Sequence, residues 1–329
     1  MQQVITELLA FQGEIEAVKG RPLSDAEFCR HYLPFSESTW SRLKRDDYGA
    51  SPTRLLAKAR QALEELPGRI EALRRAQDAE SDFRLTTLAR AVIASVSAAR
   101  DSGNRRIVPV LAPSGWGKTA IGDYYAGRGA IKIDGRQAWR ASYKAFCGDV
   151  CEAAGPALPR TASEAHAEAE MIRRLRVKGA VVLYIDEANT GGPGFANALK
   201  QIHDKTLATV VVAAIPALWD KFVARAEEEV RQVINRCQPV IRASRILPAD
   251  ARLFLSGRGL PPAAAEKIIP AALEVAHTMG GIKALQSIAD ALRDIESPTL
   301  ADAEAAIEAE RRNIVASGIP ARVSTPACK

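Results

Sequence analysis

The spacing of hydrophobic positions divides the chain into three segments and a tail. Over residues 1–80, apolar side chains recur with helical spacing, and clusters of proline and glycine separate short helices. Residues 85–248 contain short apolar runs rich in valine and isoleucine, each followed by a helical stretch. Residues 249–317 return to helical spacing, and residues 318–329 read as a loose tail. We therefore expect a helical domain, an α/β domain and a second helical domain, in that order.

The apolar runs of the middle segment have the length and composition of strands buried in a parallel sheet. Strands that alternate with helices predict a doubly wound α/β fold. The expected strands are Ile107–Leu111, Ala130–Ile133, Ala180–Ile185 and Ala208–Ala214, with a fifth over Pro239–Ile246.

The first segment carries signals for four helices. The last of them is expected over Thr53–Leu66 and should end at Pro67-Gly68, because proline disrupts a helix interior. The expected N-caps are Ser24, with Glu27 completing a capping box, and Ser36 or Ser38 for a third helix that runs to Leu43.

Composition narrows the class of protein. Of 329 residues, 47% are hydrophobic and 26% charged, as in an ordinary globular protein, and no apolar run approaches the length of a membrane span. The N-terminus reads as a helix and not as a signal peptide. The five cysteines are scattered, which favours reduced thiols and a cytoplasmic location.

The net charge of +6 is unevenly distributed. Residues 85–248 carry 23 Lys/Arg against 15 Asp/Glu, whereas the segments on either side each have a net charge of −1. A basic excess confined to one segment favours a polyanionic partner such as nucleic acid, although a merely solvated basic surface is the alternative.

A phosphate-binding loop follows the first expected strand. The sequence from Ala112 to Thr119 (APSGWGKT) lies between a strand and a helix, which is the context of a P-loop. Ala112 stands where the pattern usually has glycine, and the loop closes as long as this residue avoids positive φ. Lys118 is expected to bind the β- and γ-phosphates of ATP, and the Thr119 hydroxyl is expected to bind Mg²⁺. The remaining expected nucleotide contacts are Ser114, Gly115, Trp116, Gly117 and Ala120.

Two acids end the third expected strand. Asp186 is expected to hold Mg²⁺, and Glu187 is expected to polarise the attacking water. The alternative is a surface acidic pair that happens to follow a buried strand. With a P-loop one crossover earlier in the chain, we favour an ATPase site.

Three cations are candidates for completing this site. Arg231 and Arg236 lie in the sequence VRQVINRC, and either can stabilise charge on the γ-phosphoryl group of a neighbouring subunit. Lys283 follows Gly280-Gly281 at the start of an expected helix and can reach the γ-phosphate. For each of the three, a solvated surface charge is the alternative.

These motifs resemble those of the AAA+ transposition regulators, the family of the Mu phage B protein, TnsC, TniB and IstB. The resemblance rests on residues 112–119, on Asp186-Glu187-Ala188-Asn189 followed by residues 199–206 (LKQIHDKT), on Asn235-Arg236, and on residues 281–285, where Lys283 occupies the usual arginine position.

The resemblance implies a P-loop AAA+ parallel sheet with an N-terminal helix-turn-helix domain and a C-terminal helical lid. It also implies an ATPase that binds ATP and Mg²⁺, forms a homo-oligomeric filament or ring on duplex DNA without sequence preference, and recruits or activates a transposase for target-site selection. The fourth strand ends Ala213-Ala214-Ile215-Pro216, where the family has a polar sensor residue, so either hydrolysis is slow or another side chain orients the water. A helicase loader, a replication initiator and a nucleotide-gated switch with little hydrolysis are the alternative functions.

Two surfaces are candidates for binding DNA. Residues 100–144 carry 9 Lys/Arg against 3 Asp/Glu, and a phosphate backbone requires only such cations. The second candidate is the recognition end of the helix-turn-helix, where acidic neighbours weaken the case and where Trp40 and Leu43 are expected in the core. The first surface is expected to use Lys132, Arg136, Arg140 and Lys144, and the second Ser38, Thr39, Arg42, Lys44 and Arg45.

Overall fold

The computed structural model describes residues 2–19, 21–45, 52–188, 193–224, 228–256, 259–293 and 295–316. The chain forms two compact units, Met1–Asp82 and Phe83–Lys329. The predicted tail, residues 318–329, lies outside the described residues. No helix among the described residues is long and apolar enough to cross a membrane.

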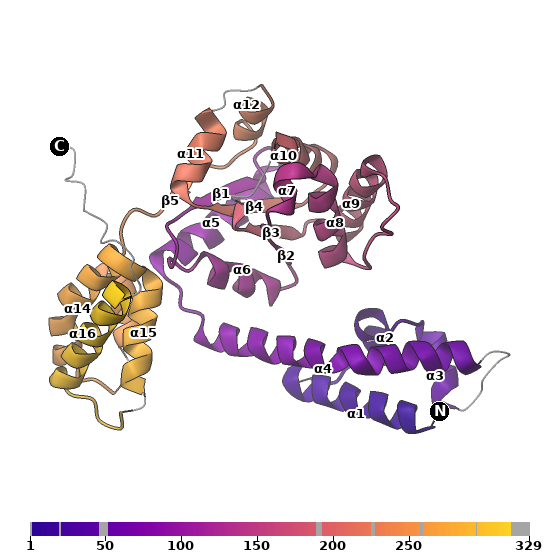
Figure 1. Ribbon diagram of the computed structural model, residues 1–329, viewed down its shortest axis with the longest axis horizontal. Coiled ribbons are helices and arrows are strands. Elements are labelled where there is room, and N and C mark those ends of the chain that lie inside the picture. Colours follow the sequence, from indigo (N-terminus) through magenta and orange to yellow (C-terminus); the bar gives the residue numbers. More distant parts are fainter. Residues whose placement is uncertain are drawn as a thin grey trace. The chain divides into compact units, whose positions relative to one another are not determined.

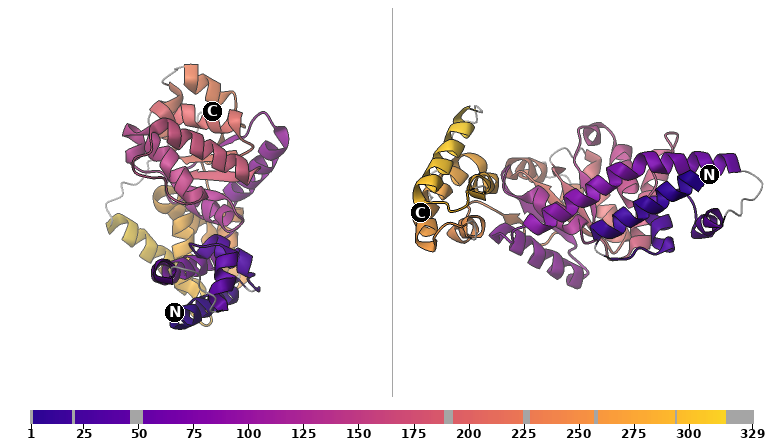
Figure 2. Two further views of the ribbon diagram at one scale, coloured as in Figure 1. Left: turned by 90° about the vertical axis from the view of Figure 1, so that its right-hand side faces the viewer. Right: turned by 90° about the horizontal axis from the view of Figure 1, so that it is seen from below.

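The first unit is entirely helical. Helices α1 and α4 lie side by side (Figure 2), and α2 and α3 pack against each other around Phe28 and Trp40. Ser24 caps α2 and Ser36 caps α3, each by accepting a backbone N–H three residues later. The helices are α1 (Gln2–Lys19), α2 (Asp25–Tyr32), α3 (Glu37–Lys44) and α4 (Pro52–Asp82).

Helix α4 does not end where the sequence predicts. It continues through Pro67 to Asp82, so the predicted break at Pro67-Gly68 is wrong. Proline removes one helical hydrogen bond, but an apolar stripe spans the site: Ala62, Leu66 and Ile70 are all buried in the core of this unit. Packing of that stripe outweighs the local preference for a break.

The second unit is built on a five-stranded parallel sheet with strand order β2-β3-β4-β1-β5 (Figure 1). The strands lie within or close to the predicted runs, except that the fifth is only two residues long. They are β1 (Ile107–Leu111), β2 (Ile131–Asp134), β3 (Val182–Asp186), β4 (Thr209–Ala214) and β5 (Ile241–Arg242). The prediction of a doubly wound α/β fold is confirmed.

Helices cover both faces of the sheet, and alternate side chains of β1 point to opposite faces. Val108 and Val110 pack with α5 and α6, whereas Ile107 and Leu111 pack with the helices of the other face. The first face carries α5 (Thr87–Ser102) and α6 (Lys118–Ala126). The second carries α7 (Ala138–Ala141), α8 (Tyr143–Ala154), α9 (Glu164–Lys178), α10 (Pro193–Lys205), α11 (Pro216–Ala224) and α12 (Glu228–Ile234).

The C-terminal helices share one hydrophobic core with the first face of the sheet. This core joins Val110 and Ile121 to Ile268 and Leu285. Asp250 adds a polar link, since its buried carboxylate accepts the N–H of Thr87 at 2.6 Å and that of Leu247 at 3.0 Å. The elements are α13 (Pro248–Leu255), α14 (Pro262–Val275), the π-helical turn η2 (Ala276–Gly280), α15 (Ile282–Arg293) and α16 (Leu300–Ala316).

Candidate nucleotide site

The P-loop lies at the carboxyl end of β1 and leads into α6. Gly115 and Gly117 have φ of 78° and 83°, a left-handed conformation that glycine adopts without a steric penalty. Ala112 is not among the described residues with positive φ, and its N–H donates to the Ala214 carbonyl at 3.2 Å. Alanine therefore suffices at this position, and the loop closes as expected.

The ammonium of Lys118 is held by the loop itself. Its Nζ donates to the carbonyl oxygens of Ala112 at 2.7 Å and Pro113 at 2.8 Å. Burial lowers the pKa of Lys118 below its ordinary value, while the nearby charges of Asp186 and Glu187 act in the opposite direction. The same pair of acids that follows β3 thus lies close enough to the lysine to favour its charged form.

The two acids at the end of β3 differ in environment. Asp186 is buried and accepts the N–H of Glu187 at 2.9 Å, whereas Glu187 is exposed. Glu187 has φ of 45°, and it is the one residue other than glycine with positive φ in the described part of the chain. Such backbone strain is concentrated at functional sites. Tyr184, two residues before Asp186, donates its hydroxyl to the Lys118 carbonyl at 2.6 Å and so fastens β3 to the start of α6.

The start of α15 lies directly on the P-loop. The backbone N–H of Lys283 donates to the Gly115 carbonyl at 3.0 Å, and the Lys283 side chain is exposed. A Cβ atom on Gly115 would lie 2.3 Å from the Gly280 carbonyl oxygen, and one on Gly281 would lie 2.6 Å from Cδ1 of Trp116. The glycines on both sides therefore permit a close approach of two backbones.

A cavity of about 240 Å³ adjoins the P-loop beside Trp116. Its lining comes from three places: the start of α5 with Thr86, the segment after β5 with Ile246, and the start of α15 with Ile282. The sequence gives little sign of this cavity, because its walls are ordinary apolar and backbone groups that lie far apart in the chain. The one local sequence feature near this cavity is the N-cap pattern at Thr86, which marks the start of α5.

Arg236 lies at the opposite edge of the sheet from the P-loop of its own chain. Its carbonyl accepts the N–H of Ile107, the first residue of β1, whereas the P-loop follows the last. A five-residue strand spans roughly 13–16 Å. The Arg236 guanidinium forms a bidentate ion pair with Asp204, and the Arg231 side chain is exposed on α12.

The four basic residues predicted to bind DNA do not share one helix face. Lys132 is on β2, Arg136 precedes α7, Arg140 is on α7 and Lys144 is on α8. Lys132 donates to Asp123 at 2.7 Å. Burial lowers the pKa of Lys132, but the neighbouring carboxylates, with Asp123 foremost, raise it above its ordinary value. Arg136 is paired with Asp149, and Lys144 donates to the Arg160 carbonyl at 3.2 Å. Arg136 and Arg140 are both exposed, but Arg136 is held by Asp149.

The second DNA-binding candidate lies on α3. Lys44 is tied to Asp25 on α2, which also accepts the indole N–H of Trp40 at 3.2 Å. Trp40 and Leu43 are buried, as predicted. The hydroxyls of Ser38 and Thr39 lie within hydrogen-bonding distance of Ser36, and Arg45 donates to the Ser41 carbonyl. Residues 46–51 are outside the described part of the chain, so the end of the predicted recognition element is not seen.

Comparisons with known proteins identify the domain that carries the P-loop. Residues 100–222 match the family model described as an AAA domain. The ORC1 protein of Aeropyrum pernix, solved in complex with DNA, is similar at 20% identity, with 71% of this chain and 68% of that chain covered and a TM-score of 0.45. No curated protein matches the chain. Neither match is to a transposition regulator, so that part of the resemblance stays a prediction. The sheet, the P-loop and the family match together give this chain a P-loop AAA+ fold with helical regions on either side.

Proposed function

We propose that the protein is a Mg²⁺-dependent ATPase that works as an oligomer on duplex DNA. The observation that carries this proposal is the division of the site between two edges of one sheet. The P-loop and the acids lie at the carboxyl edge, and Arg236 lies at the amino edge. One copy therefore cannot bring Arg236 to its own nucleotide, whereas a second copy can.

The groups at the carboxyl edge suit a nucleoside triphosphate. Backbone N–H groups of residues 114–120 would donate to phosphate oxygens at the start of α6, and the Lys118 ammonium, held here by two carbonyl oxygens, would bind these oxygens as well. Thr119 and Asp186 would hold Mg²⁺, which would neutralise negative charge on the phosphates. The exposed carboxylate of Glu187 is placed to accept a proton from water. The nucleobase of the bound nucleotide would enter the cavity beside Trp116.

The cations have distinct roles in this proposal. Lys283 contacts the γ-phosphate from α15, whose start is already bonded to the P-loop. Arg236 acts on the nucleotide of the neighbouring copy, and Arg231 is the second candidate for that role. Since β4 ends in Ala214, no polar side chain of that strand end can orient the water, which favours slow turnover.

The sequence motifs favour a specific task for this ATPase. Their resemblance to the transposition regulators supports a homo-oligomeric filament that coats DNA and recruits a transposase. A helicase loader or replication initiator is the second candidate, because the site chemistry is common to both. The basic excess in residues 85–248 supports action on DNA in either case.

Electron microscopy with duplex DNA tests this proposal. We expect filaments whose length follows the DNA when ATP is present and none with ADP. The Lys118→Ala variant should form none, whereas Lys267→Ala, which alters an exposed lysine on α14, should behave as the wild type. Discrete complexes of fixed size would favour the loader or initiator. Failure to bind DNA in any nucleotide state would refute action on DNA.

A further inference from the structure

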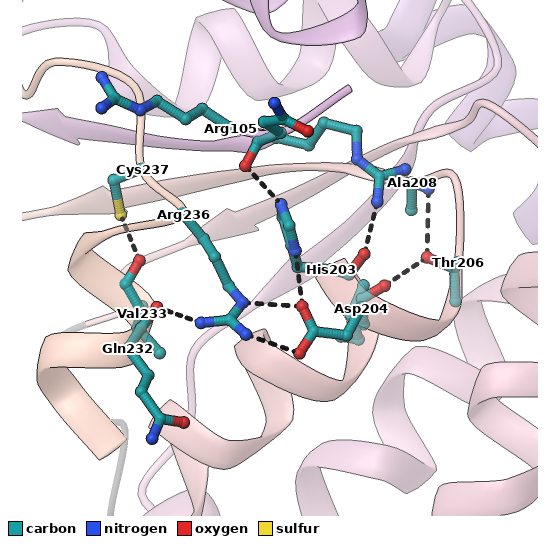
Figure 3. Close-up of polar contacts among 12 residues, drawn as sticks. Arg105, His203, Asp204, Thr206, Ala208, Gln232, Val233, Arg236 and Cys237 are labelled. Atoms are coloured by element: carbon teal, nitrogen blue, oxygen red, sulfur yellow. Dashed lines mark hydrogen bonds and ion pairs between the residues drawn. The ribbon is translucent and has the colours of Figure 1, made fainter. Parts of the chain in front are cut away.

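Arg236 is fixed by one carboxylate at the amino edge of the sheet (Figure 3). Its Nε donates to Asp204 Oδ1 at 2.7 Å and its Nη2 to Asp204 Oδ2 at 2.8 Å, while Nη1 donates to the Gln232 carbonyl at 2.6 Å. Asp204 belongs to the last turn of α10, and Arg236 follows α12. Two parallel hydrogen bonds define the plane of the guanidinium as well as its position.

The ion pair with Asp204 leaves two N–H donors of the Arg236 guanidinium available. A guanidinium has five N–H groups, and three of them have the partners just named. One N–H on Nη1 and one on Nη2 have no partner among the described residues, and 24% of the side chain is exposed. The carboxylate therefore orients Arg236 while two donors stay available for a phosphate.

His203 also contacts the carboxylate of Asp204. Its Nδ1 lies 2.8 Å from Asp204 Oδ1 and its Nε2 lies 3.1 Å from the Asn104 carbonyl oxygen. Arg106 adds a further cation, because it donates to the His203 carbonyl. Because Arg106 and Arg236 outnumber Asp204, the cluster keeps a net positive charge although Arg236 is paired.

We propose that Asp204 is the positioning residue for Arg236: its carboxylate fixes the guanidinium in the orientation that meets the nucleotide of a second copy of this chain. This inference rests on the proposed function, in which Arg236 acts in trans. A merely structural fastening of α10 to the end of α12 is the competing explanation. The two differ in one respect: loss of positioning lowers hydrolysis in the neighbouring copy alone, whereas loosening of α10 and α12 also lowers ATP binding by the chain that carries the substitution.

Mixing two inactive variants tests the difference. Lys118→Ala lacks a nucleotide site but can supply Arg236, and Arg236→Ala binds ATP but supplies no arginine, so turnover in the mixture comes from mixed contacts. Asp204→Asn is placed in the supplying chain for the measurement of turnover, and in an otherwise wild-type chain for the measurement of ATP affinity, because the receiving chain already lacks Arg236. The control is Glu266→Gln, which alters an equally bidentate pair with Arg252 on the surface of α13 and α14.

We expect Asp204→Asn in the supplying chain to lower turnover about 10- to 100-fold, as expected for misplacement of a group by about 1 Å. In the otherwise wild-type chain Asp204→Asn should leave the affinity for ATP unchanged, and Glu266→Gln should alter neither property. Asp204→Glu keeps the charge but shifts its position. In the supplying chain, this variant should give a turnover between that with Asp204 and that with Asp204→Asn.

A parallel loss of ATP affinity, or no loss of turnover with Asp204→Asn in the supplying chain, would overturn the positioning role. If the parent mixture without Asp204→Asn shows no turnover, the failure belongs instead to the proposed action of Arg236 in trans.

Discussion

The backbone N–H of Lys283 donates to the carbonyl of Gly115 at 3.0 Å, so the first turn of α15 is bonded to the nucleotide loop. Gly115 and Gly281 both have positive φ, and an added Cβ on either would collide with the other segment. A shift of the P-loop on binding phosphate must therefore also displace the start of α15. This contact gives the C-terminal helices a direct route by which to respond to nucleotide.

Gly115→Ala should disrupt this contact and weaken ATP binding. The left-handed conformation costs alanine about 1–2 kcal/mol, and the Cβ would lie 2.3 Å from the Gly280 oxygen in addition. Gly129→Ala is the control, since Gly129 has φ of 84° with nothing within 4 Å of an added Cβ. Both variants should be less stable in thermal unfolding, but only Gly115→Ala should lose affinity for ATP in titration calorimetry. Equal affinities would show that the Lys283–Gly115 contact is irrelevant to binding.

Glu187→Gln should stop turnover without releasing ATP. The amide keeps the size of the side chain but cannot accept the proton, and loss of a general base lowers rates about 10²- to 10⁴-fold. Glu266→Gln serves as a carboxylate-to-amide control on the surface. ATP binding by fluorescence titration and phosphate release measure the two properties separately. A wild-type rate in Glu187→Gln would remove the general-base role from this residue.

DNA binding should depend on Arg140 more than on Arg136. Arg140 is exposed, whereas Arg136 must first leave Asp149. The double alanine variant should keep ATP binding and lose DNA-stimulated hydrolysis, and each lost phosphate contact should lower the log–log salt slope by about 0.9. Arg312→Ala on α16 is the control, and deletion of residues 1–80 should weaken binding only in part.

Fluorescence anisotropy with two unrelated duplexes over a salt series measures these effects. Unchanged binding in the double variant, together with complete loss in the deletion, would assign DNA binding to the N-terminal unit.

Asp204 should contribute stability that is lost in acid. Hydrogen bonds from Arg236 lower the pKa of Asp204 below its ordinary value of 3.8, with a smaller contribution from His203. A lowered folded pKa means stability that is present above pH 3.8 and is lost as pH falls through the folded pKa. The difference in thermal midpoint between wild type and Asp204→Asn should thus be largest near pH 6 and shrink below pH 3.8. A constant difference over this range would contradict the ion pair.

Local sequence signals predicted the sheet and the P-loop well, for physical reasons. Buried parallel strands require continuous apolar runs, and the phosphate loop requires glycine at fixed positions, so both are visible in short stretches. The short β5 and the uninterrupted α4 were not predictable in this way. The length of β5 depends on pairing with β1, and Pro67 is retained within a helix by tertiary packing.

Contacts between distant segments account for the remaining differences. Lys132 and Arg136 look like free cations in the sequence, but Asp123 and Asp149 neutralise them in the fold. Asp204 lies 32 residues before Arg236, and no periodic pattern relates the two. The cavity beside Trp116 likewise joins segments that only the fold brings together.

The most direct test of the account is the rate of ATP hydrolysis per subunit as a function of protein concentration. A site completed by a second copy predicts a rate per subunit that rises with concentration and then saturates. Arg236→Ala should bind ATP with wild-type affinity yet hydrolyse it at least 10³-fold more slowly at every concentration, in line with the effect of arginines supplied in trans. Lys118→Ala, which should not bind ATP, sets the background. A rate per subunit that is independent of concentration and unaffected by Arg236→Ala would contradict a site shared between two copies.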